Sequence, residues 1–328
     1  MCGHRPRSLM IDSKFKLKAK RLKFDRKVML SASCMRYALL VDSNGECWAA
    51  TNHQVSQIHY LNTFTFKNLE CPAVITQISA STHFALLLST EGEVWYFGSL
   101  GKIVAYEPEE FFNIRKLDNL PKISMVAAGP HHSLYLDENG AVWAKYVINK
   151  DPFLLNLKLA MKSVHAGEQG ISILIDVNGG VWTRGPGVFE TIGANNPIPD
   201  IPPIKSAAAG SNHAVLLDEE GCVWGLGDNI HGQASTNSTL KMIQTPTKII
   251  VVAPVVHVEA KLDNSYFYTE SGIVWGIGNN FECQLGVTYA HTNTTSNSWP
   301  LQIFHEQLLI PPPGQSQILS TKSARIRE

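Results

Sequence analysis

The sequence is poor in charged residues. They make up 17% of the 328 positions, and the 28 basic and 28 acidic side chains cancel, whereas soluble domains carry about 25% charged residues. Zero net charge argues against a uniformly basic nucleic-acid-binding protein. Hydrophobic residues nevertheless reach 44%, so the chain can bury a sizeable core and is not disordered as a whole.

Long apolar runs and a secretory signal are also missing. No run reaches the ~18 residues that a membrane-spanning helix needs. The first residues, MCGHRPRSLMIDSKFK, lack the apolar centre of a signal peptide. We therefore expect a cytoplasmic protein, with a nuclear location or export by another route left open.

Cysteine is sparse, with six in the chain and no C-x-x-C pair. This argues against a zinc ribbon and against a dense disulfide scaffold. Cys34 and Cys47 flank one predicted hairpin and could meet, but we expect reduced, half-buried thiols that pack as small hydrophobic side chains.

The motifs of familiar catalytic sites are absent too. The sequence has no G-x-S-x-G, H-E-x-x-H or Walker A pattern. Its Gly-rich segments Gly225–Asn229 and Gly276–Asn280 are not dinucleotide loops, because no predicted helix follows them. We predict no catalytic residues, no metal site and no cofactor.

An internal repeat dominates what is present. Six of the seven tryptophans follow a glycine by three residues, at spacings of 39 to 51 residues, and five of these six have valine directly before them. A period near 45 residues indicates a repeat architecture. The pairs are Gly45/Trp48, Gly92/Trp95, Gly140/Trp143, Gly179/Trp182, Gly221/Trp224 and Gly272/Trp275.

Each unit predicts a β-hairpin. A nearly all-apolar strand such as 84–88 comes first, then a four-residue turn (DSNG, STEG, DENG, DVNG, DEEG or TESG), then the strand with the tryptophan. A short polar residue first and glycine last suit a type I turn followed by a left-handed position. An all-apolar strand is covered on both faces, as when sheets stack face to face.

Further strands precede the hairpins. Small-residue steps at 79–80, 127–129, 166–167 and 208–210 would let chains crowd near the axis of a ring. Proline-led strands at 71–75, 120–123, 201–204 and 245–249 suit strand starts and edges. Three or four short strands in about 45 residues describe one blade of an all-β propeller.

The repeat resembles that of the regulator of chromosome condensation family, whose outline is A-A-G-x-x-H, an apolar strand, D-x-G, V-[YW] and G-x-N-x-x-G-Q-L-G. The tails from Gly225 to Ala234 and from Gly276 to Gly286 carry the resemblance most clearly. It spans about residues 31–286 and is weak in the first and fourth units.

The resemblance implies a single propeller, and family members commonly have seven blades. Six hairpins are recognisable here, so both six blades and seven, with one degenerate or completed by the chain ends, stay open; we favour seven. We divide the chain into a tail at 1–13, a propeller at 14–310 with a basic first strand or arm at 14–27, and a flexible tail at 311–328.

The repeated polar side chains admit structural and functional interpretations. His83, His132 and His213 share one position of the repeat, and we expect them to bond neighbouring backbone. Amides in the loops between strands can tie down backbone; these are Asn229, Gln233, Asn280 and Gln284. For the tryptophans we expect packing between blades, since a light-sensing role would need the Gly-Trp-Arg-His-Thr motif of the family's plant photoreceptors.

One segment concentrates positive charge. Residues 14–27 (KFKLKAKRLKFDRK) contain eight basic side chains and one acidic one. They could form a basic arm for nuclear import, nucleic acid or anionic lipid. Their alternating pattern also suits an edge strand whose lysines discourage aggregation.

A propeller presents loops on two faces, and its function resides in those loops. We expect a monomeric protein-binding platform or adaptor without catalytic chemistry. The resemblance suggests, as an alternative, guanine-nucleotide exchange on a small GTPase of the Ran type, and a third possibility is chromatin or nucleic-acid tethering through residues 14–27. Candidate partner-binding loops are 98–112, 184–200 and 228–243.

Overall fold

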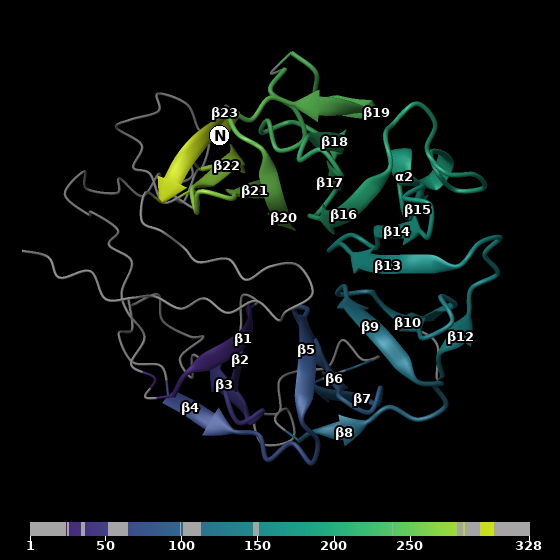
Figure 1. The fold of residues 1–328 in the computed structure, drawn as a ribbon, viewed down its shortest axis with the longest axis vertical. Helices are drawn as coiled ribbons and strands as arrows, with labels where there is room; N and C mark the ends of the chain where they lie inside the picture. The colour runs from purple at the N-terminus through teal and green to yellow at the C-terminus, as the bar shows by residue number, and fades with distance from the viewer. Residues whose placement is uncertain are drawn as a thin grey trace, which may run out of the picture.

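The computed structural model describes residues 24, 26–33, 37–51, 65–98, 100, 113–146, 151–237, 239–280, 285 and 296–304. Within these ranges the regular secondary structure is β-strand apart from one short helix, α2 (Val188–Thr191). The strands form six antiparallel sheets arranged around a common centre (Figure 1). The predicted all-β propeller is confirmed, with six blades in the described part of the chain.

Each sheet is built from strands that follow one another in the sequence. The first three sheets contain β1 (Val28–Ser33), β2 (Tyr37–Asp42), β3 (Cys47–Thr51) and β4 (Thr65–Asn68); β5 (Ile75–Ala80), β6 (Phe84–Ser89), β7 (Val94–Gly98) and β8 (Arg115–Lys116); and β9 (Ile123–Ala128), β10 (His132–Asp137), β11 (Val142–Tyr146) and β12 (Phe153–Leu154).

The other three sheets follow the same order. They contain β13 (Met161–Ala166), β14 (Ser172–Asp176) and β15 (Val181–Arg184); β16 (Ile204–Ala209), β17 (His213–Asp218), β18 (Val223–Asp228) and β19 (Met242–Ile249); and β20 (Val255–Lys261), β21 (Asn264–Thr269), β22 (Val274–Asn279) and β23 (Ser296–Phe304).

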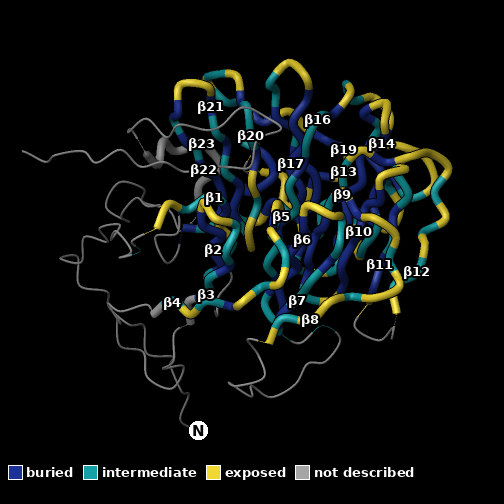
Figure 2. Tube along the Cα trace, turned by 60° about the horizontal axis from the view of Figure 1, so that its bottom comes forward, coloured by how far each residue is buried: buried dark blue, intermediate teal, exposed yellow. Residues whose placement is uncertain are grey.

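The second strand of a blade is apolar throughout because its two faces pack against different neighbours. In β17, Ala214 and Leu216 belong to the cluster shared with the fourth blade, whereas Val215 and Leu217 belong to the cluster shared with the sixth. Successive side chains of a strand point to opposite faces. Every residue of β6, β10, β14 and β17 is accordingly buried (Figure 2).

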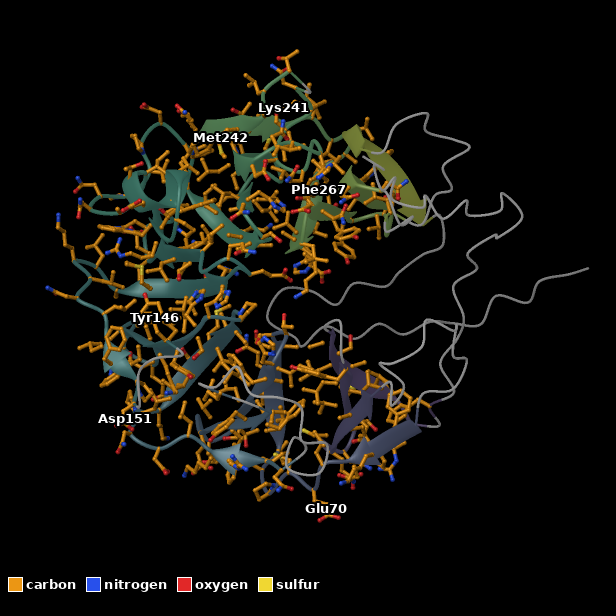
Figure 3. All side chains as sticks on the ribbon, turned by 180° about the vertical axis from the view of Figure 1, so that it is seen from behind. Glu70, Tyr146, Asp151, Lys241, Met242 and Phe267 are labelled. Atoms are coloured by element: carbon orange, nitrogen blue, oxygen red, sulfur yellow. The ribbon has the colours of Figure 1, made fainter. Side chains whose placement is uncertain are left out.

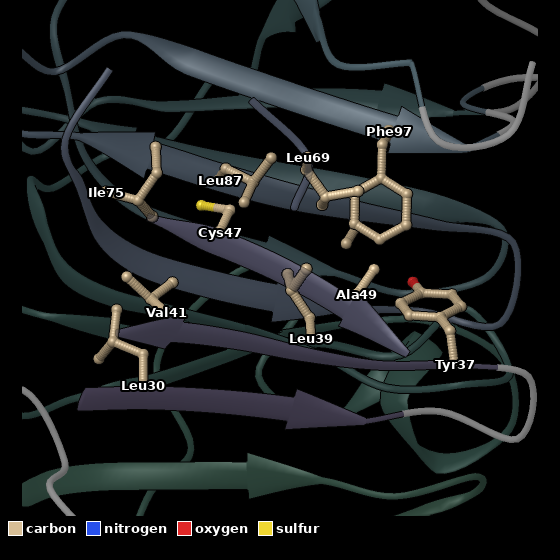
Figure 4. Packing of buried hydrophobic residues seen from close by; sticks show 11 residues of the cluster. Leu30, Tyr37, Leu39, Val41, Cys47, Ala49, Leu69, Ile75, Leu87 and Phe97 are labelled. Carbon is tan, nitrogen blue, oxygen red and sulfur yellow. The ribbon is translucent and has the colours of Figure 1, made fainter. Parts of the chain in front are cut away.

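The core is divided into five hydrophobic clusters, one at each junction between consecutive blades. Figure 4 shows the first junction, where Leu39 and Cys47 of the first blade meet Leu87 and Phe97 of the second. Blades therefore stabilise one another in sequence order. The first and last sheets make no extensive contact with each other among the described residues.

The four proline-led runs do not all occupy the same place in a blade. Three of the proline-led runs, including 201–204, lead directly into the first strand of a sheet, which lies nearest the centre (Figure 1). The run at 245–249 instead lies in β19, the outermost strand of its blade. Proline is tolerated at a strand start and on an outer edge strand alike, because neither position needs its backbone N–H for pairing within the sheet. The sequence therefore does not distinguish the two positions.

The fourth blade has only three strands. Where a fourth would pair with β15, the segment after it covers the edge: Ile198 N–H donates to Val181 O at 2.8 Å, and Thr183 N–H donates to Gly193 O at 3.1 Å. Phe189 of α2 is buried against this blade and the fifth. An edge strand that could pair with another chain is thereby protected.

The end of the basic segment docks on the first blade. The ring of Phe24 lies 5.7 Å from that of Trp48, and the Arg26 guanidinium stacks over the same indole at 4.4 Å. Arg26 also forms a 2.9 Å ion pair with Asp42. Of the predicted basic strand or arm at 14–27, residues 14–23 and 25 lie outside the described residues, and β1 begins at Val28.

Candidate functional site

The two faces of the propeller are built from different parts of the repeat. We call the "turn face" the side that carries the glycine-containing hairpin turns between second and third strands, such as 42–45. The "loop face" is the opposite side. It carries the turns between first and second strands, such as 210–212, and the loops between third and fourth strands, such as 229–241.

Each turn-face hairpin has the glycine conformation that the sequence predicts. The six turn glycines have φ between 77° and 83°, where a side chain would be strained. In four blades the first turn residue is aspartate, and its Oδ1 accepts two backbone N–H groups; for Asp218 these come from Glu220 at 3.0 Å and Cys222 at 2.8 Å. The carboxylate thereby closes the turn.

The same carboxylate also holds the tryptophan six residues later. Indole Nε1–H donates to Asp Oδ2 in four blades, a contact that the sequence analysis missed although the constant spacing encodes it. The distances are 3.1 Å for Trp48, 3.5 Å for Trp143, 2.8 Å for Trp182 and 3.0 Å for Trp224. Burial opposes ionisation of Asp42, but hydrogen bonds from Arg26, backbone and Trp48 outweigh it and lower its pKa.

Two blades lack this contact because serine or threonine begins their turn. Trp95 and Trp275 have buried Nε1 atoms with no hydrogen-bond partner, and their turns begin at Ser89 and Thr269. A buried unsatisfied donor costs stability. Five of the six repeat tryptophans, all except Trp48, pack against a junction cluster; Trp95, for example, contacts the first.

We expect the Ser89→Asp substitution to stabilise the protein by about 1 kcal/mol, because the new carboxylate would accept Trp95 Nε1–H. Urea denaturation followed by tryptophan fluorescence measures the change. The reverse substitution, Asp176→Ser, should destabilise by a similar amount or more. A loss of stability in Ser89→Asp would show that the indole and carboxylate do not meet in the second blade.

On the loop face, glycines let neighbouring turns approach closely. A Cβ atom at Gly129 would lie 2.6 Å from Gly167 O, one at Gly167 would lie 2.6 Å from Gly210 O, and one at Gly210 would lie 2.6 Å from Leu262 O. Backbone bonds join the same turns: Glu168 N–H donates to Gly210 O at 3.0 Å and Ser211 N–H to Leu262 O at 2.8 Å. The third to sixth blades are thus packed tightly around the axis.

The side chains of His132 and His213 connect neighbouring blades. His132 Nε2 lies 2.9 Å from Ser172 Oγ of the next blade, and His213 Nε2 lies 2.9 Å from Ser265 Oγ. Burial lowers the pKa of each imidazole to about 4. The expectation that His83 shares this position is wrong: His83 is half-buried one residue before β6, and Phe84 starts that strand as His132 and His213 start theirs. In the first blade Tyr37 takes this position and donates to Ser81 O at 2.9 Å.

The loop after β18 is fixed by one amide. Asn229 Oδ1 accepts Ala234 N–H at 3.0 Å, and its Nδ2 donates to Asn237 O and Leu240 O at 3.1 and 2.7 Å. Gln233 Oε1 accepts His231 N–H at 2.9 Å. Asn280 repeats the first contact with Leu285 N–H at 3.1 Å, while Gln284 lies outside the described residues.

Three carboxylates from three consecutive blades gather on the loop face. They are Glu168 of the fourth blade, Asp228 of the fifth and Asp263 of the sixth. Burial raises the pKa of Asp263; His231 opposes this shift, while Asp228 and Glu168 add to it. Glu168 also pairs with Lys261 at 2.9 Å. Only Asp228 lies in a loop that the sequence analysis selected, because nothing in the sequence brings the other two beside it.

Exposed apolar side chains lie next to Asp228, on the fifth blade. Ile230, Leu240 and Met242 on the fifth blade are 56%, 43% and 46% exposed. Figure 3 shows Met242 and Lys241 at the periphery of the ring, away from the buried Phe267. Of the other candidate loops, 184–200 covers the edge of β15, and most of 98–112 lies outside the described residues.

Within the described residues no group of three or more histidine, cysteine, aspartate or glutamate side chains could hold a metal ion. No helix in that part of the chain is long and apolar enough to cross a membrane. Cys47 is a free thiol, and its suggested partner Cys34 lies outside the described residues.

Comparison with known proteins agrees with this geometry. Residues 204–233 match the family described as "Regulator of chromosome condensation (RCC1) repeat". Over 145 residues the chain is 26% identical to the guanine nucleotide exchange factor SRM1 of Saccharomyces cerevisiae, a match that covers 37% of this chain and 30% of SRM1.

Two solved structures share the fold. Human WBSCR16 superimposes with a TM-score of 0.69 at 18% identity, over 87% of this chain and 84% of that one. Prp20p of Saccharomyces cerevisiae, described with its binding to Gsp1p and histones, gives 0.68 at 18% identity over 84% and 76%. Repeat, architecture and solved structures agree that this chain is an all-β propeller, and one of its repeats matches the RCC1 repeat.

Proposed function

We propose that this propeller is a protein-binding platform and that its partner docks on the loop face of the fourth to sixth blades. The observation that supports the proposal is the grouping of Glu168, Asp228 and Asp263 from three blades. Exposed Ile230 and Met242 lie next to Asp228. Backbone bonds between turns and the Asn229 network hold these groups in place before binding. Preorganised loops lose little entropy on association.

The chemistry of this face favours a partner with basic and apolar side chains. Carboxylates attract and orient a basic partner, and apolar groups supply buried area at the centre of an interface. Such a contact needs no covalent chemistry. The platform would act in the cytoplasm or the nucleus, in line with the sequence-based expectation.

We expect the double variant Asp228→Asn/Asp263→Asn to lose partners recovered by affinity purification of the tagged full-length protein. The matched control is Glu219→Gln/Glu220→Gln, which neutralises two exposed carboxylates in a turn-face hairpin. Loss of partners in the control but not in the loop-face variant would contradict the proposal. Retention after a high-salt wash would separate a specific partner from ionic adsorption.

Guanine-nucleotide exchange on a small GTPase is the second candidate function, favoured by the match to SRM1 and by the fold shared with Prp20p. A face that binds the nucleotide-free GTPase more tightly than the loaded form must lower nucleotide affinity by the same factor. We expect the full-length protein to accelerate release of labelled GDP from Gsp1p or a related GTPase, and Asp228→Asn/Asp263→Asn to reduce that rate. If GDP release is not accelerated for any GTPase of a panel, nucleotide exchange is rejected and the protein-binding platform stays as the proposed function.

Tethering to chromatin or nucleic acid through residues 14–27 remains a further expectation. Six of the eight basic side chains there lie at 14–23, outside the described residues. Salt-dependent DNA binding that disappears on deletion of residues 1–23 would support it, and unchanged binding would reject it.

We also retain a seventh blade as a proposal. Asn264 occupies the position of His213 in the sixth blade, and its Oδ1 is buried without a hydrogen-bond partner. In the first, third and fifth blades the side chain at this position bonds the following blade. A donor from a further blade between the last sheet and the first would satisfy it; an experimental structure with six sheets in direct closure would contradict this.

A further inference from the structure

Two cysteines from different parts of the repeat meet at the first blade junction. Cys47 is fully buried in β3, within the cluster that joins the first and second blades (Figure 4). Cys71 is half-buried in the connector from β4 to β5 and packs against the same cluster. Both thiols are free.

Backbone geometry explains why they meet. Leu69 N–H donates to Cys47 O at 2.9 Å, which extends the pairing of β3 and β4 by one residue. The chain then turns at Glu70, whose φ of 50° is a left-handed value, and whose N–H is held by Asn68 Oδ1 at 2.8 Å. This turn returns Cys71 toward Cys47, and Ile75 beyond it packs in the same cluster.

We propose that Cys47 and Cys71 form a reversible disulfide that fastens the first blade to the connector leading into the second. The bond would close a loop over residues 47–71, and it would make this junction sensitive to thiol redox conditions. From the sequence we expected reduced thiols and considered only Cys34 as a neighbour of Cys47, because those two flank one hairpin. The contact between Cys47 and Cys71 depends on the fold and is not visible in the sequence.

The two sulfurs have unequal chemistry. Cys71 receives hydrogen bonds from the Cys47 thiol and from the Ala73 N–H, and despite its burial these lower its pKa to about 7. The same contact, together with burial, raises the pKa of Cys47. Cys71 is thus the partly accessible nucleophile, since the thiolate is the reactive form, and Cys47 is the internal second thiol.

The reaction balances with a low-molecular-weight disulfide, such as oxidised glutathione, as oxidant. The Cys71 thiolate attacks one sulfur of that disulfide, which gives a mixed disulfide and releases one thiolate. Cys47 then transfers its proton to the released thiolate and attacks Cys71 Sγ, and the second glutathione thiolate leaves. The two protein sulfurs lose two electrons in total, and one glutathione disulfide is reduced to a thiol and a thiolate. The thiolate takes up from solvent the proton that Cys71 released on ionisation.

To test the proposal, the full-length protein is equilibrated in buffers with an increasing ratio of oxidised to reduced glutathione. Free thiols are then alkylated, and the peptides are mapped by mass spectrometry. We expect a directly linked pair of peptides containing Cys47 and Cys71. Cys71→Ser should abolish the link and Cys222→Ser, which removes another half-buried free thiol, should leave it unchanged. Iodoacetamide should modify Cys71 with a midpoint near pH 7 in the reduced protein.

Two outcomes would overturn the proposal. One is stable glutathionylation of Cys71 with no Cys47–Cys71 link at any redox ratio, and the other is a Cys47–Cys34 link in its place. The wild-type peptide map decides between these outcomes even if a cysteine variant folds poorly. None of these measurements depends on a partner or on nucleotide exchange, so the disulfide is tested independently of the proposed function.

Discussion

Gly225→Ala should destabilise the protein by about 3 kcal/mol or more. Gly225 lies in β18, and a Cβ atom there would overlap the carbonyl of Ala234, whose carbon would be 2.6 Å away. The obstacle is backbone, which cannot rotate aside as a flexible side chain could. Either β18 or the loop containing Ala234 must shift, and that loop carries the Asn229 network. Urea denaturation measures the loss.

Gly170→Ala is the matched control. Gly170 has a φ of 84°, yet a Cβ atom there would meet nothing within 4 Å. Its cost is therefore only that of a side chain in the left-handed region, about 1 kcal/mol. Equal, small losses in the two variants would mean that Ala234 does not press on Gly225. If Gly225→Ala also weakens partner recovery, then the loop geometry matters for the loop face.

The repeat in the sequence was enough to predict the hairpins and their stacking. Glycine at a fixed distance before tryptophan, with a short polar residue at the start of the turn, encodes a local conformation that needs no distant contact; Gly221 and Trp224 illustrate it. The apolar second strand of each unit equally predicted burial on both faces. These features are local, and each recurs often enough to be separated from chance.

What the sequence could not supply are the contacts between repeats. The His213–Ser265 pair joins residues 52 positions apart, and the acidic cluster draws Glu168, Asp228 and Asp263 from three blades at unequal positions of the repeat. The Asp–Trp hydrogen bond was within reach, because Asp218 and Trp224 keep the same separation as the other three pairs. From the sequence we predicted only packing for the repeated tryptophans and did not use this constant separation.

The buried histidines should make the protein acid-sensitive between about pH 6.5 and pH 4. His132 and His213 have pKa values of about 4 in the folded protein, against about 6.5 for an unperturbed imidazole. Between these values the unfolded chain binds more protons than the folded one, so stability falls as the pH falls. The full free energy of unfolding is present above about pH 6.5. By pH 4 the uptake of a proton by each of these imidazoles in the unfolded chain should lower it by about 3 kcal/mol.

Unfolding free energies measured from pH 7 to pH 4 in wild type, His213→Asn and Ser265→Ala would test this. His213→Asn should be less stable at pH 7, because it loses the contact between the fifth and sixth blades, but its stability should fall less steeply with acid. Ser265→Ala removes the partner hydroxyl and keeps the titrating ring, so we expect lower stability at every pH with the slope retained. If His213→Asn kept the wild-type slope, the imidazole would not be the group that titrates. The acid response would then have to come from other groups, and the neutral, buried state inferred for this ring at the blade junction would be wrong.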